Sequence, residues 1–255
     1  MTASAPRRTT KRVARRSARY PATLLSLFLL VAVALGVAPL HRGDWLLENA
    51  LAAGAVAVLV LTWRRLPLSN ASYTMLFVFL VLHEVGAHYT YSEVPYDDWF
   101  RAVLGTSPND LFGVERNHYD RVVHFMYGLL VAYPMREVFV RVADARGFWG
   151  YMLPLDLVMS TSMAYELIEW GAAMAFGGDL GVAYLGTQGD PWDAQKDMAL
   201  ATCGAAITML VTALIHRSLD RDFHREWADS LAVKHPEPLG EVLLERLRGG
   251  RGHAG

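Results

Sequence analysis

Cysteine and charge are both scarce in this chain of 255 residues. Cys203 is the only cysteine, so the chain cannot form an intrachain disulfide or a cysteine-rich zinc or iron–sulfur site, and its stability must come from packing. Only 19% of the residues are charged, and the 24 basic side chains nearly balance the 25 acidic ones. This composition lacks the basic domain typical of nucleic-acid binding. Internal repeats, low-complexity tracts and nucleotide-binding glycine motifs are also missing from the sequence.

Apolar residues, in contrast, are abundant. The hydrophobic set makes up 53% of the chain and the mean hydropathy is +0.20, which is too apolar for an ordinary soluble domain. A helix needs roughly 20 mostly apolar residues to span a bilayer. Six windows of suitable length and composition occur: 22–40, 45–63, 71–91, 120–140, 149–176 and 193–216. The sequence therefore predicts an all-α, multi-pass membrane helix bundle with six transmembrane helices in residues 22–216.

Basic residues indicate the orientation of these helices. Nineteen of the 24 Lys and Arg residues lie in 1–23, at Arg64 and Arg65, in 136–147 and after His216. By the positive-inside rule these alternate segments are cytoplasmic, and so are both termini. The first apolar run, at 19 residues, is longer than the usual 7 to 15 of a signal peptide. We expect a multi-pass protein of the bacterial inner membrane, with a basic cytoplasmic segment at 1–21 and a cytoplasmic tail at 217–255.

The first long outward loop, 92–119, contains the run YDDWFRAVLG. Its apolar residues, Trp99 and Phe100 among them, fall on one helical face, and its acidic residues fall on the other. This pattern predicts a short helix that lies on the outer membrane surface.

Ionisable side chains inside a bilayer are costly and usually face a protein interior, a partner or a water-filled cavity. The third to sixth expected helices each carry such groups near their outer ends. They are His83, Glu84, His88, Asp120, His124, Glu166, Glu169, Asp193 and Asp197. The exception is Asp156, near a cytoplasmic end, while Glu48 of the second helix lies close enough to one end to reach the interface. A common pocket that opens to the outer face explains this arrangement.

Histidine and carboxylate groups in one pocket suit zinc, iron or manganese, although no HExxH motif is present. The candidate ligands of a divalent metal are His83, His88, His124, Asp193 and Asp197. The alternative is a buried network of hydrogen bonds and ion pairs that ties the helices together, with Arg116, Arg121 and Lys196 as its cations. The sequence leaves both open.

Catalytic and substrate-binding roles are also candidates. Glu166 and Glu169, three residues apart, could act as an acid and a base, with Asp120 as a third catalytic carboxylate. Arg116, Asn117, Arg121 and Gln188 are the candidate substrate-binding residues, because arginines at a helix start suit a phosphate head group. The competing interpretations are helix-bundling carboxylates and an interfacial turn that contacts lipid head groups nonspecifically.

Four blocks of sequence carry a family resemblance: HEVGAHYTY, FGVERNHYDRVVHF, AYELIEW and LGTQGDPWDAQKDM. In this order they resemble the YjdF family of predicted bacterial inner-membrane proteins, a family of unknown function, over about residues 20–216. A looser similarity to VanZ-like membrane proteins rests on the last helix. The first resemblance implies a multi-pass membrane domain with these blocks at its polar centre, and it implies no reaction.

Three functions fit this pattern. The first is a hydrolase or transferase that acts on a lipid or lipid-linked substrate at the outer leaflet, with or without a divalent metal. The second is a proton-coupled transporter, which would need polar groups on both sides of the midplane. The third is a membrane binding or scaffold protein whose polar network is structural. The depth of the polar groups favours the first over the second, with the lipid bilayer as the immediate partner.

Overall fold

The computed structural model describes residues 17–176 and 187–234 and a few isolated positions after them. No β-strand occurs in these ranges, so the all-helical expectation is confirmed for them. Most of the basic segment 1–21, residues 177–186 and the greater part of the tail after 234 lie outside the described residues.

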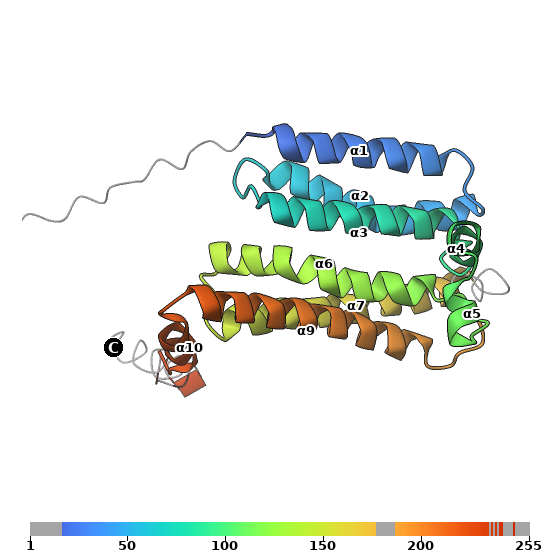
Figure 1. The fold of residues 1–255 in the computed structure, drawn as a ribbon. Helices are drawn as coiled ribbons and strands as arrows, with labels where there is room; N and C mark the ends of the chain where they lie inside the picture. The colour runs from blue at the N-terminus through green and yellow to red at the C-terminus, as the bar shows by residue number, and fades with distance from the viewer. Residues whose placement is uncertain are drawn as a thin grey trace, which may run out of the picture.

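Six long helices form two layers (Figure 1). The first layer holds α1 (Arg19–Gly36), α2 (Arg42–Thr62) and α3 (Asn70–His88); the second holds α6 (Tyr119–Val142), α7 (Trp149–Phe176) and α9 (Asp193–Leu219). Within the first layer, α3 packs on α1 and α2, and within the second, α6, α7 and α9 all pack on one another. The two layers meet mainly where α3 packs against α6.

Among the described residues, three short helices lie at the two ends of this bundle. At one end are α4 (Tyr96–Leu104) and α5 (Pro108–Phe112), and at the other is α10 (Phe223–Leu231), on the same side as the start of α1 (Figure 1). We refer to these as the α4–α5 end and the α10 end. The expected helix in the first long loop is confirmed as α4, whereas α10 was not expected from the sequence.

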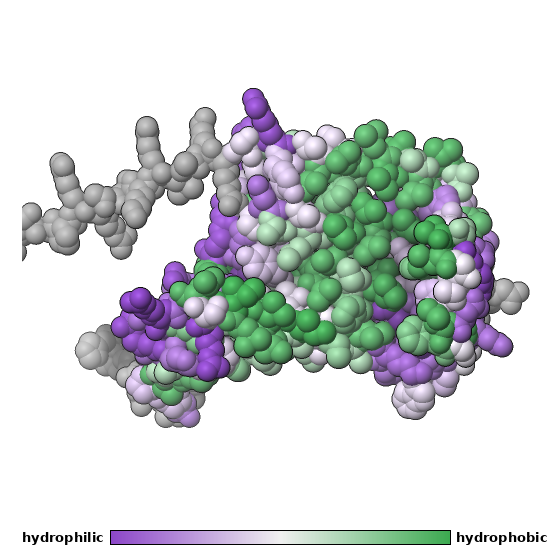
Figure 2. Space-filling model, in the orientation of Figure 1, coloured by the Kyte–Doolittle hydropathy of each residue, from purple (hydrophilic) through white to green (hydrophobic). Residues whose placement is uncertain are grey.

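In the part of the chain that the structure describes, four helices are long and apolar enough to cross a membrane: α1, α2, α3 and α9. Within the described chain, α6 and α7 do not meet that description, and both carry several charged side chains. The number of crossings therefore stays a prediction. Apolar side chains dominate the middle of the bundle and hydrophilic ones gather towards its two ends (Figure 2), which is the distribution that a bilayer requires.

The helix boundaries differ from the expected windows by a few residues at several ends. The third helix was expected to reach residue 91, yet α3 ends at His88. Thr90 and Tyr91 both adopt a left-handed backbone with φ of 53°, which stops the helix. The turn sends the Tyr91 side chain back along α3, and this places its hydroxyl at the candidate site.

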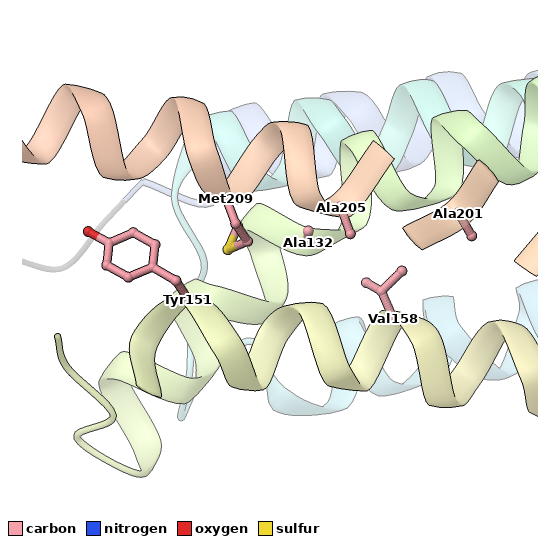
Figure 3. Packing of buried hydrophobic residues seen from close by; sticks show 6 residues of the cluster. All are labelled: Ala132, Tyr151, Val158, Ala201, Ala205 and Met209. Carbon is pink, nitrogen blue, oxygen red and sulfur yellow. The ribbon is translucent and has the colours of Figure 1, made fainter. Parts of the chain in front are cut away.

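Small residues determine how closely the second layer packs. Ala132 of α6, Val158 of α7, and Ala201 and Ala205 of α9 are fully buried in one cluster (Figure 3). Gly128 and Gly204 lie where α6 crosses α9, and a Cβ atom on Gly204 would come within 2.7 Å of the Leu129 backbone nitrogen. Backbones approach this closely only where side chains are absent. This contact brings the starts of α6 and α9, which carry the candidate site, together.

Candidate functional site

Three expected site residues converge at the α4–α5 end of the second layer. Asp120 and His124 lie one turn apart on α6 and therefore share a face, and Asp197 approaches them from α9. One ligand atom from each of these side chains lies within 4.8 Å of the other two. Asp197 is 2% exposed and His124 is 7% exposed, so this is a buried group rather than a surface acidic patch.

Glu166 and Glu169 of α7 complete this group. The His124 Nε2 atom lies 3.4 Å from Glu166 Oε1 and 3.6 Å from Asp120 Oδ1. Glu169 is close enough to interact electrostatically with both Glu166 and Asp120. We call Asp120, His124, Glu166, Glu169 and Asp197 the carboxylate–histidine cluster.

Two oxygen atoms of this cluster have no hydrogen-bond partner among the residues that the structure describes. They are Asp197 Oδ1 and Glu166 Oε1, and both are buried. A buried carboxylate oxygen without a partner is expensive, and native proteins normally satisfy it with a donor, a water molecule or a cation. The donor set of two aspartates and one histidine suits zinc, manganese or iron. The residues present therefore fit a divalent metal.

The expected metal ligand Asp193 belongs to a different group. It accepts from Arg116 at 2.5 Å and from Arg121 at 3.2 Å, and Asp190 accepts from Arg121 at 2.5 Å. We call Arg116, Arg121, Asp190 and Asp193 the arginine clamp. It joins the start of α6 to the segment that enters α9.

Lys196 adds a third cation to Asp190 after Arg121 and Arg116, with 2.5 Å between Nζ and Oδ2. The Lys196 ammonium, the Trp192 backbone N–H and the Arg121 guanidinium hold the pKa of the Asp190 carboxyl well below its ordinary value. Asp190 therefore stays ionised at neutral pH, and the clamp remains an ion-pair network.

The other two expected substrate-binding residues bind each other. The Asn117 backbone N–H donates to Gln188 Oε1, and Gln188 Nε2 donates to the Asn117 carbonyl, each at 3.0 Å. Together with Arg116 and Arg121 they lie at the α4–α5 end as expected, where they contact other protein groups.

The two histidines of α3, His83 and His88, point in different directions. His83 is 8% exposed, and its Nδ1 atom lies 2.6 Å from the Tyr91 hydroxyl. His88 Nδ1 instead lies 2.6 Å from the Leu35 carbonyl oxygen of α1. Five residues of helix rotate a side chain by well over one turn, so His83 faces the second layer while His88 faces α1. The structure thus places His88 away from the carboxylate–histidine cluster.

A cavity of about 340 Å³ lies between the two layers beside this cluster. Its polar lining includes His83, Asp120 and His124 and the hydroxyl groups of Tyr91, Tyr127, Thr161, Ser162 and Tyr165, and the remaining lining is apolar. Gly86 makes room for this arrangement, because a Cβ atom there would collide with the Tyr91 ring.

Glu48 and Tyr165 also belong to this region, although neither was predicted from the sequence. Glu48 is 6% exposed rather than directed to the interface, and it accepts a hydrogen bond of 2.7 Å from the Tyr165 hydroxyl of α7. The position of Glu48 near the edge of an apolar run could have indicated that it belongs to the site, since intramembrane carboxylates are usually functional or paired. Glu84, 1% exposed, faces α2 near Trp45 and Asn49.

Comparison with known proteins identifies a family and a relative that are similar to this chain. The family described as "Predicted membrane protein (DUF2238)" matches residues 20–218. The chain belongs to this family. It is also 36% identical over 188 residues to inner membrane protein YjdF of Escherichia coli (strain K12), which covers 73% of this chain and 86% of the relative. No solved structure matches the chain.

These findings confirm the family resemblance drawn from the four sequence blocks. The chain is an integral protein of the bacterial inner membrane, in a family of unknown function. Both groups described above, the carboxylate–histidine cluster and the arginine clamp, lie within the part of the chain that the DUF2238 family matches.

Proposed function

We propose that this protein is a metal-dependent hydrolase or transferase that acts on a lipid or lipid-linked substrate at the outer leaflet. The observation that carries the proposal is the convergence of Asp120, His124 and Asp197 within 4.8 Å beside a cavity. A divalent metal on these ligands would polarise a carbonyl or phosphoryl oxygen and activate a bound water molecule. Glu166, 3.4 Å from His124, would serve as the base beside that position.

The membrane topology that this function needs is six crossings with both termini in the cytoplasm. The six long helices alternate in direction, and the start of α1 and the end of α9 lie on the same side of the bundle (Figure 1). The basic residues gather on that side, which supports the inward orientation. The cluster then lies towards the outer leaflet.

We expect fusions of a periplasm-active phosphatase to distinguish the two orientations. A reporter at Thr106 or Gly189, both in segments at the α4–α5 end, should be active, and one at the C-terminus should be silent. A cytoplasm-active fluorescent reporter at the same positions should give the reverse pattern, which controls for expression. An active phosphatase at the C-terminus would end the proposal of cytoplasmic termini.

The metal itself is tested by elemental analysis of detergent-purified protein. Wild type should carry a stoichiometric transition metal, and His124→Gln and Asp197→Asn should lose it, because each removes a ligand atom from the cluster. His88→Gln is the matched control: it makes the same chemical change at a histidine that faces α1, and it should keep the metal. Protein free of transition metal in wild type would refute the metal site.

Catalysis needs a second measurement. Wild type reconstituted into vesicles of phosphatidylethanolamine and phosphatidylglycerol should form a cleaved or transferred lipid product that mass spectrometry detects. Glu166→Gln, which keeps the shape of the side chain and removes its basicity, should retain the metal and lose the product. Retained metal with no product in wild type would favour a binding or scaffold protein.

A transporter is supported less well by the arrangement of polar groups. Asp156, the acidic residue on the other half of α7, is exposed on the helix surface and is not part of the cavity lining. A relay across the membrane would need polar groups that continue from the cluster towards the α10 end.

A further inference from the structure

The cavity beside the cluster has a buried floor and an exposed mouth. Its floor comes mainly from α3 and α6, where Leu80, His83, Val123 and His124 are all less than 9% exposed, with Ala52 of α2 and Ser162 of α7 also buried. The exposed lining residues all come from the other two helices: Leu51 and Ala55 of α2, and Thr161, Ala164 and Ile168 of α7. The mouth therefore opens sideways between α2 and α7.

This mouth is continuous with the surface that faces lipid. Leu51 is 49% exposed and Ile168 is 47% exposed, and α2 is one of the helices apolar enough to cross a membrane. At that depth the surrounding medium is hydrocarbon rather than water. An apolar cavity of about 340 Å³ that opens to hydrocarbon is energetically suited to an alkyl chain, and its volume lies in the range of ordinary ligand pockets, about 300–1,000 Å³.

The cavity is also polarised along its length. Its carboxylate and imidazole groups lie at one end, where Asp120 and His83 line it with Tyr91 towards the α4–α5 end. Further into the bundle the lining consists of Ala55, Phe79 and Leu80 together with the hydroxyl groups of Tyr127, Thr161 and Ser162, and the first two of these hydroxyls are hydrogen-bonded to each other. An amphiphile with its head towards Asp120 and its chain along Phe79 would match both halves. The chemistry of the lining thus fits a lipid better than a wholly polar or wholly apolar ligand.

One hydrogen bond links the two helices that border the mouth. The Tyr165 hydroxyl of α7 donates to Glu48 Oε2 of α2 at 2.7 Å, and Tyr165 itself lines the cavity. This contact ties α7 to α2 at the polar half, so entry is directed to the apolar part of the mouth.

We propose that this cavity holds the hydrocarbon chain of a membrane lipid, which enters sideways between α2 and α7 and presents its head group to the carboxylate–histidine cluster. The inference rests on the proposed function, because it names the substrate of that same site. The substrate class is then a lipid whose reacting bond lies at the junction of head group and chain, rather than a water-soluble molecule.

Photo-labelling in vesicles tests this occupant directly. Wild type is reconstituted with phosphatidylglycerol that carries a diazirine in its acyl chain, irradiated, and mapped by peptide mass spectrometry. Bulk lipid reaches only exposed residues such as Val58 and Leu61. Val123 is 5% exposed and lines the cavity, so we expect adducts on it; Leu80 also lines an apolar pocket between α1, α2 and α3, so a label there does not identify the cavity. Labels confined to exposed residues would overturn the proposal, whether water or another protein fills the cavity.

A matched pair of variants adds a second measurement. Ala55→Trp places an indole in the mouth, and Ala53→Trp makes the same change at an exposed residue of α2 outside the cavity lining. Ala55→Trp should reduce floor labelling at least about tenfold, with labelling of Val58 and Leu61 unchanged as proof of folding, and Ala53→Trp should match wild type. Equal floor labelling in both variants would contradict entry through this mouth.

The two proposals can fail separately. If the buried floor residues were labelled but the protein held no metal, the lipid site would be supported and the proposed metal-dependent chemistry would be refuted. If the protein held a stoichiometric metal but the floor residues were not labelled, the metal site would be supported and the proposal of a lipid chain in the cavity would be refuted.

Discussion

Gly204→Leu is expected to lower the stability of the folded protein by about 3 kcal/mol or more, because overpacking of a core contact typically costs about 1–3 kcal/mol and here the obstacle is backbone. A Cβ atom at Gly204 would lie 2.7 Å from the Leu129 nitrogen and 3.2 Å from the Gly128 carbonyl carbon. Backbone atoms cannot rotate away as a side-chain tip can, so α9 must move off α6.

The measurement is the yield and melting temperature of detergent-purified protein. Gly54→Leu is the control: nothing lies within 4 Å of the position of its Cβ atom on α2, so it should behave as wild type. Because α6 and α9 carry Asp120, His124 and Asp197, the metal content of Gly204→Leu should fall together with its folded yield. Equal melting temperatures for both variants would mean that the α6–α9 contact is looser than the structure places it.

The second large effect is expected at the arginine clamp. Asp193→Ala removes the carboxylate that Arg116 and Arg121 both contact, and the Asp193 side chain is only 5% exposed. Breaking a buried ion pair by removing one partner costs about 3–5 kcal/mol, since a charge is left in a poorly solvated site. We expect a melting temperature well below that of wild type, with the metal site retained in the protein that still folds.

Asp98→Ala provides the matched control on the same side of the bundle. Asp98 contacts Arg101 at 3.3 Å, but its side chain is 77% exposed, and exposed pairs contribute about 0–1 kcal/mol. If Asp193→Ala lost the metal while its melting temperature stayed that of wild type, Asp193 would be a ligand, as the sequence pattern indicates, and the clamp would not be structural.

The residues of the candidate site were largely predictable one by one. Asp120 and His124 share a face because they are four residues apart on one helix, and this follows from local geometry alone. The cost of ionisable groups in a bilayer also identifies Glu166, Glu169 and Asp197 as inward-facing from their positions in apolar runs. Their assembly into one cluster agrees with that reasoning.

The division of these residues into separate groups was not predictable. Asp193 and Asp197 lie one turn apart on α9, yet the first pairs with Arg116 in the arginine clamp and the second has an oxygen within 4.8 Å of ligand atoms of His124 and Asp120. The four-residue spacing allows either aspartate to join either group, because the partner of each carboxylate depends on which cation lies nearer to it in the folded chain. That neighbour, Arg116, is 77 residues away in sequence from Asp193.

The membrane class, the position of the long helices and the family could all be predicted from the chain's residue order, since each depends on apolar run length or on local motifs. Three-dimensional packing was needed to show that His83 faces the cavity while His88 faces α1, and that Glu48 is buried against Tyr165. Apolar residues surround most of these helices, so no polar stripe marks the buried face. The rotation of each helix is therefore set by its packing partners, of which the close contact between Gly128 and Gly204 is the clearest example.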